Sequence, residues 1–254
     1  MKILILQNRM GIGDMIMFLP FIEAISKKFK TPVTILAKKN TKVEMYFNNK
    51  EIVEEIMYLE REDNKKHSGV KGFFKLVNEL KLKKFDKVFI FNSSLRYFLI
   101  SKFSGIKEVF HYPLFKKKNQ QIIEAAKEFT LKSIGEDIES TPRLFLKEQD
   151  ILKARKDHSI DQSITNIILG IGGSGKTKRV PASIFKSFMS KVLKRSNCRF
   201  FLMTGNNIDE LKIMDEIIES EYKEYCTPLN NFTIKEILPI IPNCQIAICN
   251  DSSF

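Results

Sequence analysis

Near the amino terminus, an apolar run gives way to a short glycine-containing segment that ends in a carboxylate. Residues 3–7 are followed by Gly11, Gly13 and Asp14, after which apolar residues resume up to Pro20. A buried strand, a glycine turn and a helix in this order predict a ligand site, because open parallel sheets bind ligands at the carboxyl ends of their strands. The structural alternative for Asp14 is a helix cap, in which its carboxylate accepts hydrogen bonds from free backbone amides.

A second glycine-rich loop, residues 170–177, matches the phosphate-loop pattern GxxxxGK[ST] and follows an apolar stretch. Such a loop cradles phosphates with backbone amides and a lysine, here Lys176, so one hypothesis is a nucleotide hydrolase or kinase. Pro181 argues against it, because proline in the first turns of the following helix removes a donor and clashes with the preceding carbonyl. A helix that begins near Pro181 fits better, because proline is favourable at the first helical position. Residues 246–251, an apolar run that ends in Asp251, could imitate the acidic strand that holds magnesium in such proteins, so this alternative stays open.

Short apolar segments alternate with amphipathic ones along the chain, which predicts an α/β fold with mostly parallel, doubly wound sheets. In the first part we expect strands at 3–7, 33–37, 56–59, 87–91 and 109–112, and helices at 14–29, 41–48, 71–83, 94–103 and 120–134. After a charged, helix-like stretch at 147–156 the pattern restarts, with strands at 166–171, 199–203 and 245–249 and helices at 182–195, 208–220 and 233–241.

The restart of the pattern predicts two domains, residues 1–160 and residues 161–254. The last expected strand runs into Asn250, Asp251, Ser252 and Ser253, where another helix normally follows. We therefore expect the second domain to be incomplete and the chain to be truncated at its carboxyl end.

The composition is that of a folded protein with an excess of cations. Of 254 residues, 43% are hydrophobic and 28% are charged, and 42 Lys and Arg against 30 Asp and Glu give a net charge of +12. This charge fits an anionic partner such as a nucleotide, a phosphorylated sugar, an acidic lipid surface or nucleic acid, and it also fits a solvated lysine-rich surface. A non-catalytic basic binder of nucleic acid or lipid is a third hypothesis, although no recognisable binding module is present.

Cysteine and histidine spacing predicts no bound structural metal. Cys198, Cys226, Cys244 and Cys249 occur without a CxxC pair, and the three histidines are far apart in sequence. Reduced core thiols are therefore expected. Arg9 and Asp14 interrupt the first apolar run, so it does not read as a secretory signal, and no apolar stretch approaches the roughly 18 residues of a membrane span. A cytoplasmic protein is expected.

Three short motifs, in order along the chain, resemble those of the heptosyltransferase family, glycosyltransferase family nine. Its members are ADP-heptose:lipopolysaccharide heptosyltransferases. The first motif is Ile12-Gly13-Asp14 with Pro20; the second is Gly172-Gly173-Ser174 with Lys178-Arg179-Val180-Pro181; the third is Asp251-Ser252-Ser253. Gly173, Val180 and Ser253 stand where the family has alanine, tryptophan and glycine.

This resemblance implies a GT-B fold, in which two Rossmann-like domains face a cleft. The first domain would hold the acceptor and the second a nucleotide-sugar donor, ADP-heptose. The implied activity is an inverting, metal-independent transfer of a sugar, heptose, to a lipopolysaccharide core acceptor, with no cofactor besides the donor substrate. Because that acceptor is anionic and membrane-bound, peripheral contact with the inner leaflet of the cytoplasmic membrane is expected. A monomer with no nucleic-acid partner is expected.

The resemblance also assigns roles to residues. Asp14 would be the base that takes the proton of the attacking hydroxyl, and Lys178 the main cation on the departing diphosphate, with Lys176 and Arg179 as rivals. Gly11 and Gly13 would form the acceptor-side loop. Asp209 or Glu210 would accept hydrogen bonds from the ribose, unless they are only first-turn acids favoured by the helix dipole. The expected donor-binding residues are Gly172, Gly173, Ser174, Lys178, Asp209, Glu210, Asp251, Ser252 and Ser253.

Overall fold

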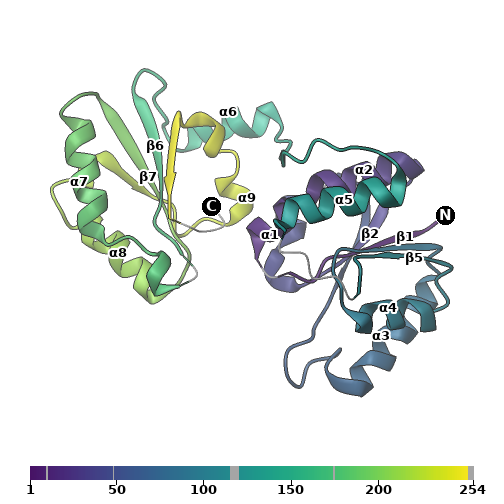
Figure 1. Ribbon diagram of the computed structural model, residues 1–254. Coiled ribbons are helices and arrows are strands. Elements are labelled where there is room, and N and C mark those ends of the chain that lie inside the picture. Colours follow the sequence, from purple (N-terminus) through teal and green to yellow (C-terminus); the bar gives the residue numbers. More distant parts are fainter. Residues whose placement is uncertain (10, 48, 115–119, 174, 251–254) are drawn as a thin grey trace. The chain divides into compact units, whose positions relative to one another are not determined.

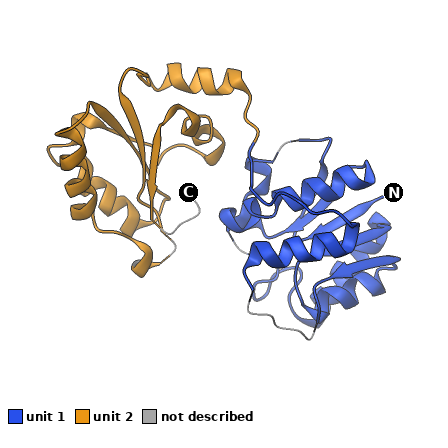
Figure 2. Ribbon diagram, turned by 45° about the horizontal axis from the view of Figure 1, so that its top comes forward, with its two compact units in different colours: residues 1–144 blue, residues 145–254 orange. Residues whose placement is uncertain are grey.

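The chain folds into two compact units, Met1–Leu144 and Phe145–Phe254 (Figure 2). The computed structural model describes residues 1–9, 11–47, 49–114, 120–173 and 175–250. Helix α6 (Glu148–Asp157) falls in the second unit, so the division lies earlier than the expected domain boundary after residue 160. The physical reason is packing, because Ala154 of α6 is buried against the second sheet together with Ile160 and Ile168.

The first unit is a five-stranded parallel sheet in the order β3-β2-β1-β4-β5, with helices on both faces (Figure 1). Side chains alternate between the two faces, because successive residues of a strand point in opposite directions. Ile3 and Ile5 of β1 pack with α2 and α5, whereas Leu4 and Leu6 pack with α3 and α4. The strands are β1 (Ile3–Leu6), β2 (Val33–Ala37), β3 (Val53–Tyr58), β4 (Lys87–Ile90) and β5 (Glu108–His111). The helices are α1 (Ile12–Ile16), α2 (Leu19–Phe29), α3 (Gly69–Lys83), α4 (Leu95–Phe103) and α5 (Ile122–Ile134).

Two expected helices of this unit differ from the structure. The helix expected at 14–29 is divided into α1 and α2, with Pro20 in the first turn of α2, where its missing amide costs no helical hydrogen bond. The helix expected at 41–48 was wrong, because two short 3₁₀ turns occupy this region, η1 (Lys39–Thr41) and η2 (Val43–Met45). Lys42 between them has a left-handed φ of 49°, which ends any continuous helix.

The second unit has a four-stranded parallel sheet in the order β8-β7-β6-β9. Its strands are β6 (Thr165–Gly170), β7 (Cys198–Met203), β8 (Cys226–Pro228) and β9 (Ile246–Cys249), and its longer helices besides α6 are α7 (Ala182–Leu193) and α8 (Ile208–Ile218). The helix expected at 233–241 is only the short α9 (Ile234–Ile237) followed by a 3₁₀ turn, Ile241–Asn243. Strand β8 was not anticipated, since it has three residues and ends in a proline.

In both sheets the strand that comes first in the sequence, β1 or β6, lies inside the sheet, and later strands are added on both of its sides. The neighbours of β1 are β2 and β4, and the neighbours of β6 are β7 and β9. This is the doubly wound, Rossmann-like α/β fold that the sequence predicts. The loops after β1 and β6 therefore lie at the topological switch points, where ligands bind in open α/β sheets.

Candidate functional site

The loops after β1 and β4 meet at the carboxyl edge of the first sheet. The Phe91 amide, just beyond β4, donates a hydrogen bond to the Leu6 carbonyl at 3.0 Å. The side chain of Gln7 is buried, and its Oε1 accepts a hydrogen bond from the Arg9 amide at 2.6 Å. Gln7 therefore folds the β1 loop back on itself, which holds Arg9 and the start of α1 close to the strand ends.

Asp14 is not a helix cap. The N-cap of α1 is Gly11, with φ of 109°, a backbone conformation that favours glycine, and no side chain caps this helix. Asp14 is the third helical residue; its side chain is 26% exposed and one carboxylate oxygen, Oδ1, lies 4.0 Å from Arg9 Nη1. The carboxylate is thus held beside a cation with part of its surface open to solvent.

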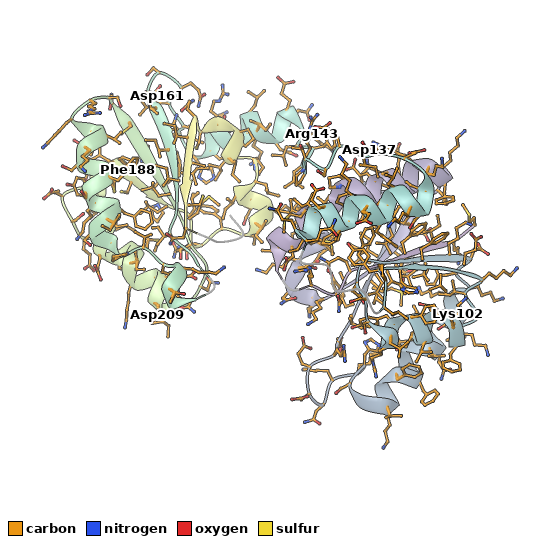
Figure 3. All side chains as sticks on the ribbon, viewed as in Figure 1. Lys102, Asp137, Arg143, Asp161, Phe188 and Asp209 are labelled. Carbon is orange, nitrogen blue, oxygen red and sulfur yellow. The ribbon has the colours of Figure 1, made fainter. Side chains whose placement is uncertain are left out.

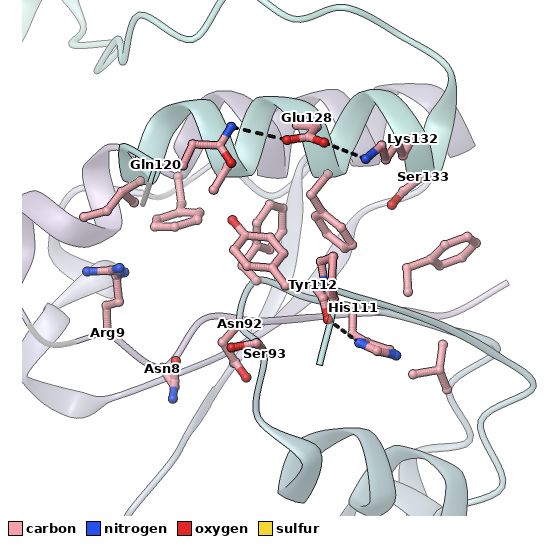
Figure 4. A pocket seen from close by; sticks show the side chains of 18 residues that line it. Asn8, Arg9, Asn92, Ser93, His111, Tyr112, Gln120, Glu128, Lys132 and Ser133 are labelled. Atoms are coloured by element: carbon pink, nitrogen blue, oxygen red, sulfur yellow. Dashed lines mark hydrogen bonds and ion pairs between the residues drawn. The ribbon is translucent and has the colours of Figure 1, made fainter. Parts of the chain in front are cut away.

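A pocket of about 990 Å³ lies in the first unit, between the ends of β4 and β5 and helix α5 (Figure 4). Aromatic rings form much of its wall, and amide, hydroxyl and charged groups converge on it from the ends of β1, β4 and β5 and from α5. The lining residues include Arg9, Phe18, Phe91, Asn92, Tyr112 and Phe129. Sequence reasoning missed Asn92 and Tyr112, although both closely follow apolar strands, which is the signal that could have found them.

Two buried polar atoms in this pocket have no hydrogen-bond partner among the described residues, Asn92 Nδ2 and Tyr112 Oη. The other amide atom of Asn92, Oδ1, accepts a hydrogen bond from the Ser94 amide at 2.9 Å, which fixes the orientation of the side chain. Burial raises the pKa of the Tyr112 hydroxyl above its usual range, with Arg9 opposing the rise, so the phenol stays protonated and can donate. Unpaired buried polar atoms are rare and costly in folded proteins, so they mark a place that suits a polar ligand.

Helix α5 provides the opposite wall of the pocket (Figure 4). The Glu128 carboxylate accepts hydrogen bonds from Lys132 Nζ at 2.6 Å and from Gln120 Nε2 at 3.3 Å. Phe129, one residue further along α5, packs edge to face against Phe91 and Tyr112, with ring centroids 5.0 Å apart in both pairs. These ring contacts position the Tyr112 hydroxyl within the pocket.

The loop after β6 in the second unit is tied to the start of α8 by Glu210. Oε1 of this buried carboxylate accepts a hydrogen bond from the Gly173 amide at 3.0 Å. Oε2 accepts from the Thr204 hydroxyl at 3.2 Å and from the Gly205 amide at 3.0 Å. Glu210 thus connects the two glycine-containing loops, and it engages a Gly173 amide that sequence reasoning had assigned to the donor.

Arg179 makes a second connection between the same two loops. Its Nε donates to the Gly173 carbonyl at 2.9 Å, and its Nη1 pairs with Asp209 Oδ2 at 2.8 Å. The Arg179 side chain is mostly buried, whereas the side chain of Asp209, in the first turn of α8, is about half exposed (Figure 3). The guanidinium of Arg179 is therefore occupied within the protein.

Asn250, the last described residue, joins the end of β9 to the same region. Its Nδ2 donates to the Ile171 carbonyl at 2.6 Å, and its Oδ1 accepts from the Val180 amide at 3.3 Å. The strands are also close here, since a Cβ on Gly170 would lie 2.8 Å from Cys249 Sγ. The end of β6 therefore requires a glycine.

The phosphate-loop interpretation does not fit the helix positions. Residues Lys176–Lys178 form one 3₁₀ turn, and α7 begins only at Ala182, after Pro181 as its N-cap. A phosphate loop needs its helix to begin at the Gly-Lys-Thr step, so that the first amides point at the phosphates. The predicted helix start near Pro181 is confirmed.

The sequence-predicted site residues fall into two groups. Asp14, Gly11 and Gly13 lie in the first unit, and Gly172, Gly173, Lys178, Asp209 and Glu210 lie in the second. Lys178 is exposed, and its amide donates to the Gly175 carbonyl at 3.0 Å. Ser174, Asp251, Ser252 and Ser253 lie outside the described residues, as does the side chain of Lys176.

Burial raises the pKa of all four cysteine thiols above its usual value. All four cysteines are free, and burial raises the pKa of the Cys226 and Cys244 thiols to about 12, so both stay protonated at neutral pH. In the described part of the chain, no three His, Cys, Asp or Glu side chains are grouped so that they could hold a metal ion. Nor does any helix there have the length and apolar character that a membrane crossing requires.

Two doubly wound α/β units with parallel sheets in these orders form the GT-B fold. The fold is similar over the whole chain to that of E. coli ADP-heptose LPS heptosyltransferase II, with a TM-score of 0.71 and 17% identity, covering 100% of this chain and 80% of that one. For the glycosyl transferase family 9 protein of Veillonella parvula DSM 2008 the TM-score is 0.72 and the identity 18%, and the match covers 99% of this chain and 76% of that one. For E. coli heptosyltransferase WaaC with ADP the TM-score is 0.68 and the identity 14%, and the match covers 100% of this chain and 82% of that one.

The chain therefore shares its fold with the family-nine heptosyltransferases. No protein-family model matches the sequence, and no curated protein matches it either.

Proposed function

We propose that this protein is an inverting glycosyltransferase that moves a sugar, heptose, from ADP-heptose to a lipopolysaccharide core acceptor. The observation that carries the proposal is the position of Asp14. Its carboxylate lies at the switch point of the first sheet and does not cap a helix. It is also close to Arg9, which lines the pocket. The shared fold supports it, because two of the similar structures are E. coli heptosyltransferases and one of these holds ADP.

In this mechanism Asp14 accepts the proton of the attacking acceptor hydroxyl. The acceptor oxygen forms a bond to the anomeric carbon as the bond from that carbon to the diphosphate breaks on the opposite face, so the configuration inverts. The proton ends on Asp14 and the electron pair on the departing nucleoside diphosphate. A positioned base of this kind supplies roughly 10²- to 10⁴-fold in rate.

The pocket of the first unit would take part of the acceptor. A sugar ring presents hydroxyl groups at its edge and C–H groups on its faces, which suits unpaired Asn92 Nδ2 and Tyr112 Oη beside aromatic walls. Arg9, at the same wall, would meet an anionic substituent of the acceptor.

The β6 loop of the second unit would take the donor. Lys178 is the proposed cation for the leaving diphosphate, with Lys176 as its rival in the same turn. We assign Glu210 and Arg179 to holding the loop, since both already bridge it to α8. Gly172, Ser174, Asp209, Asp251, Ser252 and Ser253 remain proposed donor contacts. We also propose that the protein is a cytoplasmic monomer that meets its membrane-bound acceptor at the inner leaflet of the cytoplasmic membrane.

A thermal-shift series on the purified protein tests the donor assignment. We expect ADP-heptose to raise the melting temperature equally with and without magnesium, because binding to the native state stabilises it. Lys178→Ala should reduce this shift, whereas Lys194→Ala on the second unit, at the end of α7, should not. A shift only with ATP and magnesium, or binding of DNA without any response to nucleotide sugars, would replace this function with one of the alternatives.

A further inference from the structure

The outward faces of α3 and α4 combine apolar side chains with lysines and carry no carboxylate. The exposed residues of α3 recur every three or four positions, so they form one face: Val70, Lys71, Phe74, Lys75, Asn78, Lys81 and Leu82. Phe74 is 58% exposed and Leu82 is 81% exposed. On α4 the exposed residues are Leu95, Lys102 and Phe103, the last 62% exposed.

Aromatic contacts join the two helices into one surface. The ring of Phe73 lies 5.2 Å from that of Phe74 and 6.0 Å from that of Phe103, both edge to face. Lys102 projects from α4 next to Phe103 (Figure 3). We call the exposed residues of both helices the α3–α4 face: Val70, Lys71, Phe74, Lys75, Asn78, Lys81, Leu82, Leu95, Lys102 and Phe103.

The single acidic residue of these two fully described helices is Glu79, and it is directed elsewhere. Its carboxylate is 2.8 Å from Lys66 Nζ and 3.1 Å from His67 Nε2, and so belongs to the loop before α3. The absence of acids is not a property of every helix, because α8 exposes Asp215 and Glu216. The α3–α4 face is therefore selectively positive and apolar.

We propose that the α3–α4 face binds the surface of an anionic phospholipid bilayer. Phe74 and Phe103 would enter the headgroup region, and the four lysines would meet lipid phosphates, which is how helices with apolar and lysine side chains bind membrane surfaces. Charge complementarity selects this occupant over a second copy of the chain, because a symmetric contact would place lysines against lysines. The inference rests on the proposed function, which brings the protein to the inner leaflet, and it names the surface that makes this contact.

Flotation of the purified protein with vesicles tests this inference. We expect binding to phosphatidylcholine vesicles that contain phosphatidylglycerol and little binding to phosphatidylcholine alone, with the difference reduced by salt. Lys75→Gln and Lys102→Gln should each weaken binding about fivefold, the equivalent of about 1 kcal/mol per lysine near such a surface. Phe74→Ser with Phe103→Ser should weaken it further.

Ile184→Ser with Ile208→Ser is the matched control, since both residues are exposed and apolar but lie in the second unit. Unchanged melting temperatures should accompany the two lysine variants, because the substituted side chains are exposed. Equal loss in the control, equal binding to both kinds of vesicle, or a change of oligomeric state in place of vesicle binding would overturn the proposal. Vesicle binding without any response to ADP-heptose would overturn only the transferase.

Discussion

The carboxyl edges of the two sheets occupy equivalent places in similar topologies, but their polar groups are used differently. In the first unit the Asp14 carboxylate caps nothing, and Asn92 and Tyr112 each leave a buried polar atom without a partner among the described residues. In the second unit Glu210 and Arg179 fasten the loop to α8. The same topology thus supports one site whose polar groups are available to a ligand and one loop that hydrogen bonds and ion pairs within the protein hold in place.

This difference separates function from stability. Polar groups that are open to a ligand contribute little to the folded state by themselves, so their replacement should affect chemistry or binding alone. Buried groups with several partners stabilise the fold, because the loss of one partner leaves the others unsatisfied at a cost of about 1–3 kcal/mol. Substitutions at the two sheet edges should therefore give opposite patterns of activity and stability.

The largest effect is expected for Asp14→Asn in the first unit. Turnover should fall by roughly 10²- to 10⁴-fold, because the amide cannot accept the proton, while the melting temperature stays the same. Steady-state assays of sugar transfer, alongside thermal unfolding, measure both. Normal turnover by this variant would remove Asp14 as the base and leave the open loop without a catalytic role.

Lys178→Ala should come next, with turnover lower by about 10²- to 10³-fold, the typical result of losing one group that stabilises developing negative charge. Its stability should change little, since the side chain is exposed. Lys176→Ala is the informative partner variant. A larger loss for Lys176→Ala than for Lys178→Ala would move the cation role to Lys176.

Glu210→Gln should destabilise the second unit by about 1–3 kcal/mol, because one carboxylate oxygen becomes an amide nitrogen that faces a backbone donor. Asp209→Asn is the control on the same helix. That exposed carboxylate pairs only with Arg179 among the contacts described for it, so the change should cost at most about 1 kcal/mol. Chemical denaturation measures both, and equal effects would show that Glu210 does not fix the loop.

Tyr112→Phe should change the stability by no more than about 0.5 kcal/mol, because the hydroxyl has no partner among the described residues. The KM for the acceptor should rise about three- to tenfold, the value of one hydrogen bond, with the KM for the donor unchanged. A marked loss of stability would mean that the hydroxyl is already satisfied in the folded protein. The comparison between the two sheet edges would then fail at this position.

The sequence by itself determined the elements and their order. Most strands lie within a few residues of their expected positions, because apolar runs between polar loops are a local signal of buried parallel strands. Pro181 likewise placed the start of α7 correctly, since its effect on a helix is confined to a few residues. Local rules failed where the chain bends sharply, as at Lys42, or where a strand is very short, as at β8.

Only the tertiary structure decided which polar groups meet. The Glu210 carboxylate receives the amide of Gly173, 37 residues away, because β6 and β7 pair in register and carry their loops to the same edge. Asn92 and Tyr112 converge for the same reason from the ends of neighbouring strands β4 and β5. Periodicity along the chain reflects burial of each element, whereas contacts between loops depend on strand order and register, which no local pattern specifies.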